Sequence, residues 1–185
     1  MPFLTPDQIQ NIGFKSIGNN VLISDKASFY NAKNISIGNN VRIDDFCILS
    51  AGVGGITLKN YIHIACYTSL IGKSNITMDD FSVLSSKVAV YSSTDDFSGE
   101  YMISPMCRSE DSKVKSVPIY IGKHTVVGTG SVILPGATIN EGVALGAMTL
   151  LKTDTKEFSI YVGNPARYLR QRSNRCKLLA ETYES

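Results

Sequence analysis

A six-residue repeat constrains the fold of this chain more than any other feature of its sequence. Aliphatic residues recur at every sixth position in runs that together reach from Ile37 to Leu151. The members of these runs are Ile37, Ile43, Leu49, Leu58, Ile64, Leu70, Met78, Leu84, Val90, Ile121, Val127, Ile133, Ile139, Leu145 and Leu151. A period of six fits neither a helix nor a simple alternating strand. It fits a solenoid in which each hexapeptide is one short parallel strand followed by a corner.

A second position in the repeat supports the same fold. In most repeats, the fourth residue after the aliphatic one is small or β-branched: Val41, Cys47, Ile62, Thr68, Ser82, Val88, Thr125, Ser131, Ala137, Val143 and Thr149. Glycine, asparagine and aspartate at the remaining positions suit tight corners. We therefore predict an all-β prism in which the aliphatic residue points inward and three hexapeptides make one coil.

The repeat also divides the chain of 185 residues, which we expect to be a single domain. The expected parts are an N-terminal cap (1–19), two stretches of β-helix (20–96 and 118–163), an intervening loop (97–117) and a C-terminal helix (164–185). The loop contains no hexapeptide period. A long irregular loop in a compact fold is usually functional or disordered, so we expect it to bind a ligand.

Both ends of the solenoid need caps, because a repeat cannot bury its own faces. Thr5 and Gln8 match a helix capping box, Pro6 suits the first helical position, and Gly13 is a stop signal. At the other end, residues 166–181 carry apolar residues among arginine and lysine. This pattern predicts an amphipathic helix that closes the C-terminal end.

Composition narrows the possible functions and location. The net charge of +2 is too mild to indicate a nucleic-acid partner. No apolar run approaches the roughly 20 residues of a transmembrane helix, and the first residues show no signal sequence, so we expect a cytoplasmic protein. The four cysteines are scattered without a CxxC pair, which predicts free thiols rather than disulfides or a metal site.

The C-terminal half resembles a known enzyme family. The segments "PIYIGKHTVVGTGSVILPGATINEGVALGAMTLLKTD" and "VGNPARYLRQR" are similar to the hexapeptide-repeat acyltransferases, and the resemblance covers roughly residues 20–172. Within this family, the sequence is most similar to sugar acetyltransferases of the galactoside and surface-polysaccharide type. The resemblance implies a left-handed parallel β-helix, acetyl-CoA as donor, and a homotrimer with active sites between subunits.

The resemblance also implies which residues bind coenzyme A. The pantetheine arm would pass the corner residues Gly128, Thr129, Gly146 and Ala147, and the nucleotide end would meet Lys152, Arg167 and Arg170. Arginine and lysine suit phosphate, although a solvated basic face would look the same in sequence. The glycines could equally serve only as corners. Lys152 stands one place earlier than the family's Thr-Lys-Asp pattern, because this chain has "LKTD".

The catalytic group is the unusual part of the sequence. Transfer to a sugar hydroxyl needs a base near neutral pKa, usually histidine, and the galactoside-type relatives carry one directly before the loop. Counting from Val90 places Asp95 at that position. His124 lies at a corner, where we expect an exposed side chain. His63 belongs to a segment that the resemblance places across the subunit interface, facing Asp95 and Asp96 of the neighbouring chain.

Two mechanisms therefore remain open. His63 of one subunit and Asp95 or Asp96 of the next could form a relocated His–Asp dyad that acts on a hydroxyl. Alternatively, the acceptor is an amino sugar, and Asp95 binds the ammonium group and passes its proton on. In both mechanisms, the amide of Thr129 would stabilise the oxyanion.

We predict an acetyl-CoA-dependent acetyltransferase that acts on a hydroxyl or amino group of a free or nucleotide-linked sugar, in the biosynthesis of a surface polysaccharide. A catalytically inactive β-helical scaffold or binding protein is the alternative, since a missing histidine is also what an inactive relative would show. A zinc hydratase of the γ-carbonic anhydrase type needs three histidines, and the chain has two.

Overall fold

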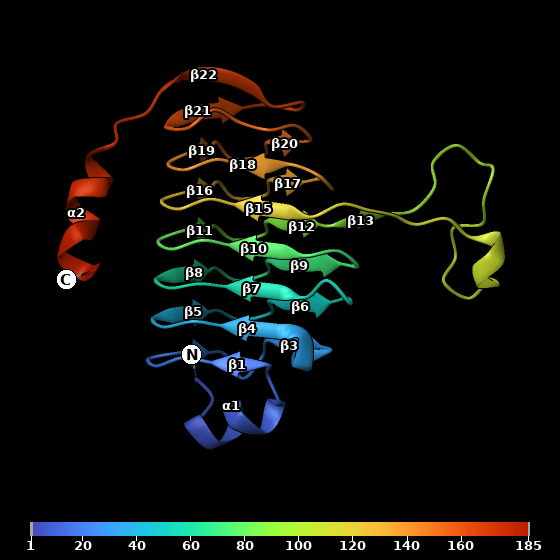
Figure 1. Cartoon of the computed structure of the whole chain (residues 1–185), viewed down its shortest axis with the longest axis horizontal. Coiled ribbons are helices and arrows are strands. Elements are labelled where there is room, and N and C mark those ends of the chain that lie inside the picture. The colour runs from blue at the N-terminus through green and yellow to red at the C-terminus, as the bar shows by residue number, and fades with distance from the viewer. Residues whose placement is uncertain (1, 185) are drawn as a thin grey trace.

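The protein is a three-sided prism of short parallel strands, stacked coil upon coil (Figure 1). The computed structural model describes residues 2–184. The coil is a left-handed parallel β-helix, which confirms the predicted fold class. All pairings between coils are parallel, whereas the last two strands, β21 and β22, are antiparallel.

Each face of the prism is one sheet. The first sheet contains β1 (Ser16–Ile17), β4 (Ile35–Ile37), β7 (Ile56–Leu58), β10 (Ile76–Met78), β15 (Ile119–Ile121) and β18 (Thr138–Ile139). The second contains β2 (Leu22–Ile23), β5 (Val41–Ile43), β8 (Ile62–Ile64), β11 (Val83–Leu84), β16 (Val126–Val127), β19 (Ala144–Leu145), β21 (Ser159–Val162) and β22 (Arg167–Gln171). The third contains β3 (Ser28–Tyr30), β6 (Ile48–Ala51), β9 (Ser69–Gly72), β12 (Ala89–Tyr91), β17 (Val132–Ile133) and β20 (Leu150–Leu151).

Three edges join these faces. We call the corner between the first and second sheets the first edge, that between the second and third sheets the second edge, and that between the third sheet and the next coil the third edge. The interior is filled by the predicted aliphatic residues, and every one of them is at most 2% exposed. The small or β-branched residues at the fourth position are also buried. The hexapeptide pattern therefore predicted the core correctly at both positions.

The N-terminal cap matches the prediction. Helix α1 (Pro6–Ile12) starts at the capping box, in which Thr5 Oγ1 accepts from the Gln8 amide and Gln8 Oε1 accepts from the Thr5 amide. Gly13 ends the helix with φ of 78°, a left-handed conformation that favours glycine. The β-helix itself begins at Ser16, slightly earlier than residue 20.

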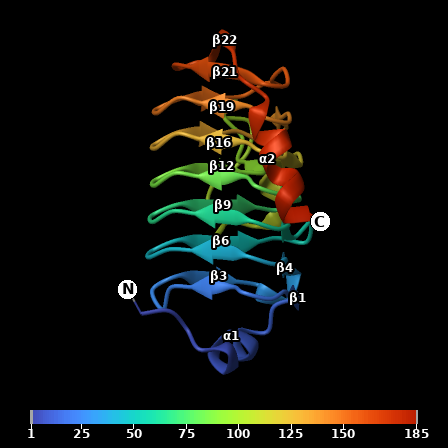
Figure 2. The ribbon, with the colours of Figure 1, turned by 90° about the vertical axis from the view of Figure 1, so that its left-hand side faces the viewer.

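The C-terminal segment differs from the prediction of one helix over 164–185. Residues Arg167–Gln171 form β22, which pairs with β21 and covers the strand edge that would otherwise end the second sheet unpaired. Helix α2 begins only at Arg175 and ends at Glu184. It does not close the end of the prism but runs back along its side (Figures 1 and 2).

Side-chain contacts hold α2 beside the first edge. Arg172 Nη1 donates to the carbonyl oxygens of His124 and Gly142 at 2.9 and 2.8 Å, which fixes the start of the segment. At the other end, the Tyr183 ring packs edge-on against Tyr61 at a centroid distance of 5.7 Å. Ala180, between these contacts, is 5% exposed.

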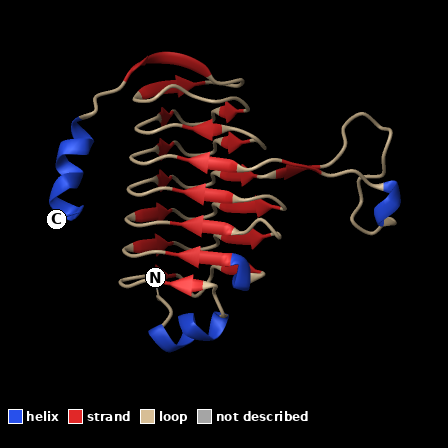
Figure 3. Cartoon of the chain, viewed as in Figure 1, coloured by secondary structure: helices blue, strands red, loops and turns tan. Residues whose placement is uncertain are grey.

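The loop leaves the third edge as an arm. Strands β13 (Ser93–Thr94) and β14 (Lys115–Ser116) form an antiparallel ribbon, and the segment between them carries the short 3-10 helix η2 (Ser109–Asp111). The arm projects away from the prism (Figures 1 and 3). The coils continue in register across this insertion, because β12 pairs with β17 directly. A second 3-10 helix, η1 (Ala32–Asn34), lies between β3 and β4.

Candidate active site

The second edge brings the predicted cofactor residues into one column. The strand register aligns Leu84, Val127 and Leu145 in successive coils. The two corner residues that follow each of them therefore stack as Ser85–Ser86, Gly128–Thr129 and Gly146–Ala147. The corresponding residues one coil earlier are Ala65 and Cys66. The sequence thus placed Gly128, Thr129, Gly146 and Ala147 on a single edge.

The two glycines of this column have a packing role of their own. A Cβ on Gly128 would lie 2.6 Å from the Ala147 nitrogen, and one on Gly146 would lie 2.8 Å from Val162 Cγ1. Their missing side chains let neighbouring coils approach closely. Contact of Gly128 and Gly146 with a ligand stays a prediction.

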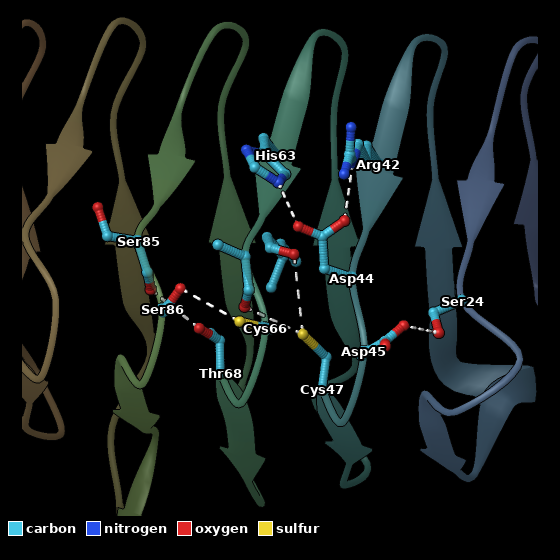
Figure 4. A network of polar contacts seen from close by, with 12 residues as sticks. Ser24, Arg42, Asp44, Asp45, Cys47, His63, Cys66, Thr68, Ser85 and Ser86 are labelled. Atoms are coloured by element: carbon cyan, nitrogen blue, oxygen red, sulfur yellow. Dashed lines mark hydrogen bonds and ion pairs between the residues drawn. The ribbon is translucent and has the colours of Figure 1, made fainter. Parts of the chain in front are cut away.

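Thr129 and Ala147 offer free backbone donors at this edge. Within residues 2–184, neither amide donates a hydrogen bond. The Thr129 side chain is engaged, since its Oγ1 donates to the Ser86 carbonyl oxygen at 2.6 Å. The Ser86 hydroxyl lies 3.3 Å from the free thiol of Cys66 (Figure 4). The column therefore combines unpaired N–H groups with small polar side chains, which suits a polar ligand and a developing oxyanion.

His63 lies on the outer face of the second sheet, next to this column. Its Nε2 is 2.8 Å from Asp44 Oδ2, and Arg42 Nε donates to Asp44 Oδ1 at 2.7 Å (Figure 4). Burial of Asp44 disfavours its charge, but the hydrogen bonds from Arg42 and His63 outweigh this and hold its pKa below the usual 3.8. Within its own chain, the carboxylate partner of His63 is thus Asp44, which the sequence did not predict.

Asp95 and Asp96 lie elsewhere, at the base of the arm. The Asp95 side chain is exposed beyond β13. Asp96 is used locally: its Oδ2 accepts from the Ser98 and Gly99 amides at 3.0 Å each. The side-chain hydrogen bond from Ser98 and these amides lower the pKa of Asp96. Within one chain, the structure does not bring either aspartate to His63, and their meeting across subunits stays a prediction.

The residues predicted for the nucleotide end of coenzyme A are partly gathered. Lys152 and Arg167 both line a small cavity of about 150 Å³ beyond the last coil. Arg170 does not line it but pairs with Ile160 in the β21–β22 ribbon. The cavity therefore offers two cations to a phosphate, and a role for Arg170 remains a prediction.

His124 corrects one expectation. The sequence suggested an exposed corner side chain, but the residue is only 7% exposed. Its ring stacks on Phe81 with centroids 5.2 Å apart, and Arg172 covers its backbone carbonyl. Helix α2 explains the burial, because it lies over the first edge. The sequence alone did not place the helix there.

Comparison with known proteins identifies the family. No family model matches the chain. The chain is 48% identical to the dTDP-4-amino-4,6-dideoxy-D-glucose acyltransferase of Escherichia coli, over 100% of its length and 96% of the relative. The chain belongs to the hexapeptide-repeat sugar acyltransferases. It is therefore an enzyme that uses a CoA thioester, and the scaffold alternative is wrong.

Solved structures agree with this assignment. The enzyme matches AntD, an N-acyltransferase from Bacillus cereus in complex with dTDP and coenzyme A, with a TM-score of 0.93 and 44% identity over 98% of this chain and 97% of AntD. The acetyltransferase domain of PglB from Neisseria gonorrhoeae, at 20% identity and a TM-score of 0.57, shares the fold. In residues 2–184, no helix is long and apolar enough to cross a bilayer.

Proposed function

We propose that the enzyme transfers an acyl group from acyl-CoA to the 4-amino group of a dTDP-4-amino-4,6-dideoxy sugar. The observation that carries this proposal is the 48% identity, over the whole chain, to an acyltransferase named for that substrate. AntD, solved with dTDP and either coenzyme A or 3-hydroxybutyryl-CoA, supports it. We place the reaction in the cytoplasm, where CoA thioesters are available, and assign its product to a surface polysaccharide.

The site favours an amine over a hydroxyl acceptor. A hydroxyl needs a general base with a pKa near neutral, but Asp95 occupies the position of the expected histidine and is exposed. An amine needs less help, because a fraction is neutral near pH 7 once the site desolvates it. A carboxylate then has only to bind the ammonium form and accept its proton.

The solved variants of AntD support Asp95 as that carboxylate. They include replacements of one serine and of one aspartate ten residues further along the chain. In this enzyme, Ser85 with Asp95 and Ser86 with Asp96 both have that spacing. Asp96 is already occupied by the amides of the arm's first turn, so we assign the acceptor amine to Ser85 and Asp95.

The reaction follows from these positions. The neutral amine attacks the thioester carbonyl carbon, and the N–H of Thr129 stabilises the oxyanion that forms there. The C–S bond then breaks and coenzyme A leaves with the electron pair of that bond. The proton lost by the nitrogen passes through Asp95 to the departing thiolate, so the products are an amide and a free thiol.

We infer a homotrimer in which neighbouring subunits share each site. Ser85 lies at the second edge and Asp95 beyond the third edge, so one chain presents its two halves of the site in different places. The arm carries exposed apolar residues, including Phe97 and Met106, both 91% exposed, which a neighbouring subunit could cover. Mixed trimers test this directly. If each site takes Ser85 from one subunit and Asp95 from its neighbour, refolding inactive Ser85→Ala and Asp95→Asn subunits together restores activity at the sites that receive both intact residues. No recovery contradicts a shared site.

The principal test measures thiol release with dTDP-4-amino-4,6-dideoxyglucose and with its 4-hydroxyl counterpart. Acetyl-CoA and 3-hydroxybutyryl-CoA serve as donors. We expect turnover with the amine only, and a fall of about 100-fold in kcat for Asp95→Asn. His63→Ala should leave kcat within a few-fold, whereas a His–Asp dyad requires it to fall as strongly as Asp95→Asn. Full activity in both variants contradicts the site assignment.

A further inference from the structure

We propose that Arg42, Asp44 and His63 form a subsite for the diphosphate of the nucleotide-linked acceptor. The inference rests on the proposed function, because it requires an acceptor that carries a nucleoside diphosphate. It gives the His63 cluster a binding role in place of a role as base.

The cluster presents two nitrogen-bearing side chains from adjacent coils. Arg42 and His63 are paired neighbours in strands β5 and β8, and Asp44 lies between their side chains (Figure 4). The side chain of Asp44 is 12% exposed, against 47% for Arg42 and 39% for His63. The carboxylate is therefore the buried anchor, and the two nitrogen-bearing side chains reach outward.

The donors that remain free point to an anion. Asp44 uses Oδ1 for Arg42 Nε and Oδ2 for His63 Nε2, so both of its oxygens are engaged. Among residues 2–184, the terminal nitrogens of Arg42 and Nδ1 of His63 have no hydrogen-bonding partner. The Arg42 guanidinium lies 5.7 Å from the centre of the Phe3 ring, which helps to fix its plane. A fixed guanidinium with free terminal N–H groups matches phosphate oxygens in a bidentate way.

The position of the cluster fits the shape of the acceptor. His63 and Arg42 lie one and two coils from the coil of Ser85, or roughly 5 and 10 Å along the prism at the usual strand spacing. In a nucleotide-linked 4-amino sugar, the diphosphate is attached at C1, across the ring from the amine. With the amine at Ser85, a sugar that lies along the second sheet toward the earlier coils brings its diphosphate within reach of Arg42.

Coenzyme A also contains a diphosphate, but its predicted partners lie in the opposite direction. Lys152 and Arg167 line their cavity beyond the last coil, on the other side of Ser85 from Arg42. The charge around Arg42 does not oppose a phosphate, since the nearby Asp45 carboxylate is paired with Lys26 at 3.1 Å. The location thus assigns the cluster to the acceptor rather than to the donor.

The first edge supplies a matched control. Lys59 pairs with Asp79 at 2.9 Å, and the two side chains are 47% and 12% exposed, the same values as for Arg42 and Asp44. The second hydrogen-bonding partner of Asp79 is the Tyr120 hydroxyl rather than a histidine. Lys59→Met therefore removes a cation of equal exposure from an equally buried carboxylate, on an edge that has no role in the proposed site.

The experiment measures dissociation constants of dTDP and of coenzyme A by calorimetry for wild type, Arg42→Met, Arg42→Lys, His63→Gln and Lys59→Met. We expect Arg42→Met to weaken dTDP binding about 10- to 100-fold, as for loss of a bidentate phosphate contact. Arg42→Lys should weaken dTDP binding about three- to tenfold. It also serves as a variant that keeps the contact to Asp44. Lys59→Met should stay within twofold, and coenzyme A binding should be unchanged in every variant.

Three results would overturn the proposal. The first is no measurable binding of dTDP by the wild type. The second is an equal loss for Arg42→Met and Lys59→Met, and the third is a parallel loss of coenzyme A affinity in Arg42→Met. Failure of this proposal can be told apart from failure of the proposed function, because thiol release by the wild type with the amino sugar is measured independently. On that reaction, His63→Gln should raise KM for the sugar and leave kcat within a few-fold.

Discussion

The first and second edges are built from the same repeat but use their side chains in opposite ways. At the first edge, Asn39, Asn60 and Asp80 hydrogen-bond from one coil to the next, and the rings of Tyr61 and Phe81 stack with centroids 4.6 Å apart. At the second edge, Phe46 and Tyr67 also stack, with centroids 4.9 Å apart. In the later coils of that edge, however, the column residues Ser85–Ser86, Gly128–Thr129 and Gly146–Ala147 are small or hydroxyl-bearing, and within residues 2–184 the amides of Thr129 and Ala147 donate no hydrogen bond. The corner side chains of the first edge are thus engaged in contacts between coils, whereas the column of the second edge leaves backbone donors available to a ligand.

This difference shows how a repeat protein separates stability from chemistry. The core pattern is identical around the prism, so the corners are where coils can differ without disturbing the strands. Helix α2 covers the first edge and so limits the access of ligands to that edge. The second edge is free of α2 and carries the proposed site.

The largest expected effect on stability is at the stacked rings of the first edge. Phe81 lies between Tyr61 and His124, so Phe81→Ala removes two stacking contacts and leaves a gap beneath α2. We expect the free energy of unfolding to fall by about 2–3 kcal/mol, measured by urea titration at fixed protein concentration. Val53→Ala at the third edge, where the side chain is 87% exposed, is the control and should change the free energy of unfolding by less than about 0.5 kcal/mol. Equal losses in the two variants would contradict a stabilising role for the stacked rings of the first edge.

A smaller effect is expected from the asparagine ladder. Asn60 Oδ1 accepts from the amide and side chain of Asn39, and Asn60 Nδ2 donates to Asp80. Asn60→Ala breaks all three bonds and should cost about 1–2 kcal/mol in the same titration. Ser86→Ala on the second edge loses only a contact to Cys66 and should cost less than about 0.5 kcal/mol. A larger cost at Ser86 would show that the second edge also holds the coils together.

The smallest effect compares the two buried carboxylates under acid. Burial opposes the charge of Asp44 and of Asp79, but their hydrogen bonds prevail and both pKa values lie below 3.8. A lowered folded-state pKa adds stability that is complete above the unfolded value and is lost as pH falls through the folded one. Asp44→Asn and Asp79→Asn should therefore be destabilised at pH 7, and the deficit should narrow toward pH 3. A deficit independent of pH would contradict this assignment of the hydrogen bonds.

Much of the fold could be predicted because its signal is local. Each hexapeptide carries its own inward residue and corner, so counting by six located the core from Ile37 to Leu151 without knowledge of the contacts between coils. The same count placed Asp95 at the base of the arm. The capping box at Thr5 and Gln8 was equally local.

The partners of His63 could not be found in this way. Asp44 and His63 are 19 residues apart, and their contact depends on the length of the coil between them. That length varies: Ile43 pairs with Ile64, 21 residues on, whereas Val127 pairs with Leu145, 18 residues on. Sequence spacing alone therefore does not say which corner residues stack.

The six-residue period was enough to predict the prism and its core, because each hexapeptide carries its own inward residue, and the C-terminal motifs were enough to predict the family. The course of α2 back along the first edge and the contacts of Asp44 with Arg42 and His63 became visible only in the folded chain. The physical reason is that these contacts join residues from different coils. Their alignment is set by corner lengths and backbone pairing, which no short stretch of the chain records.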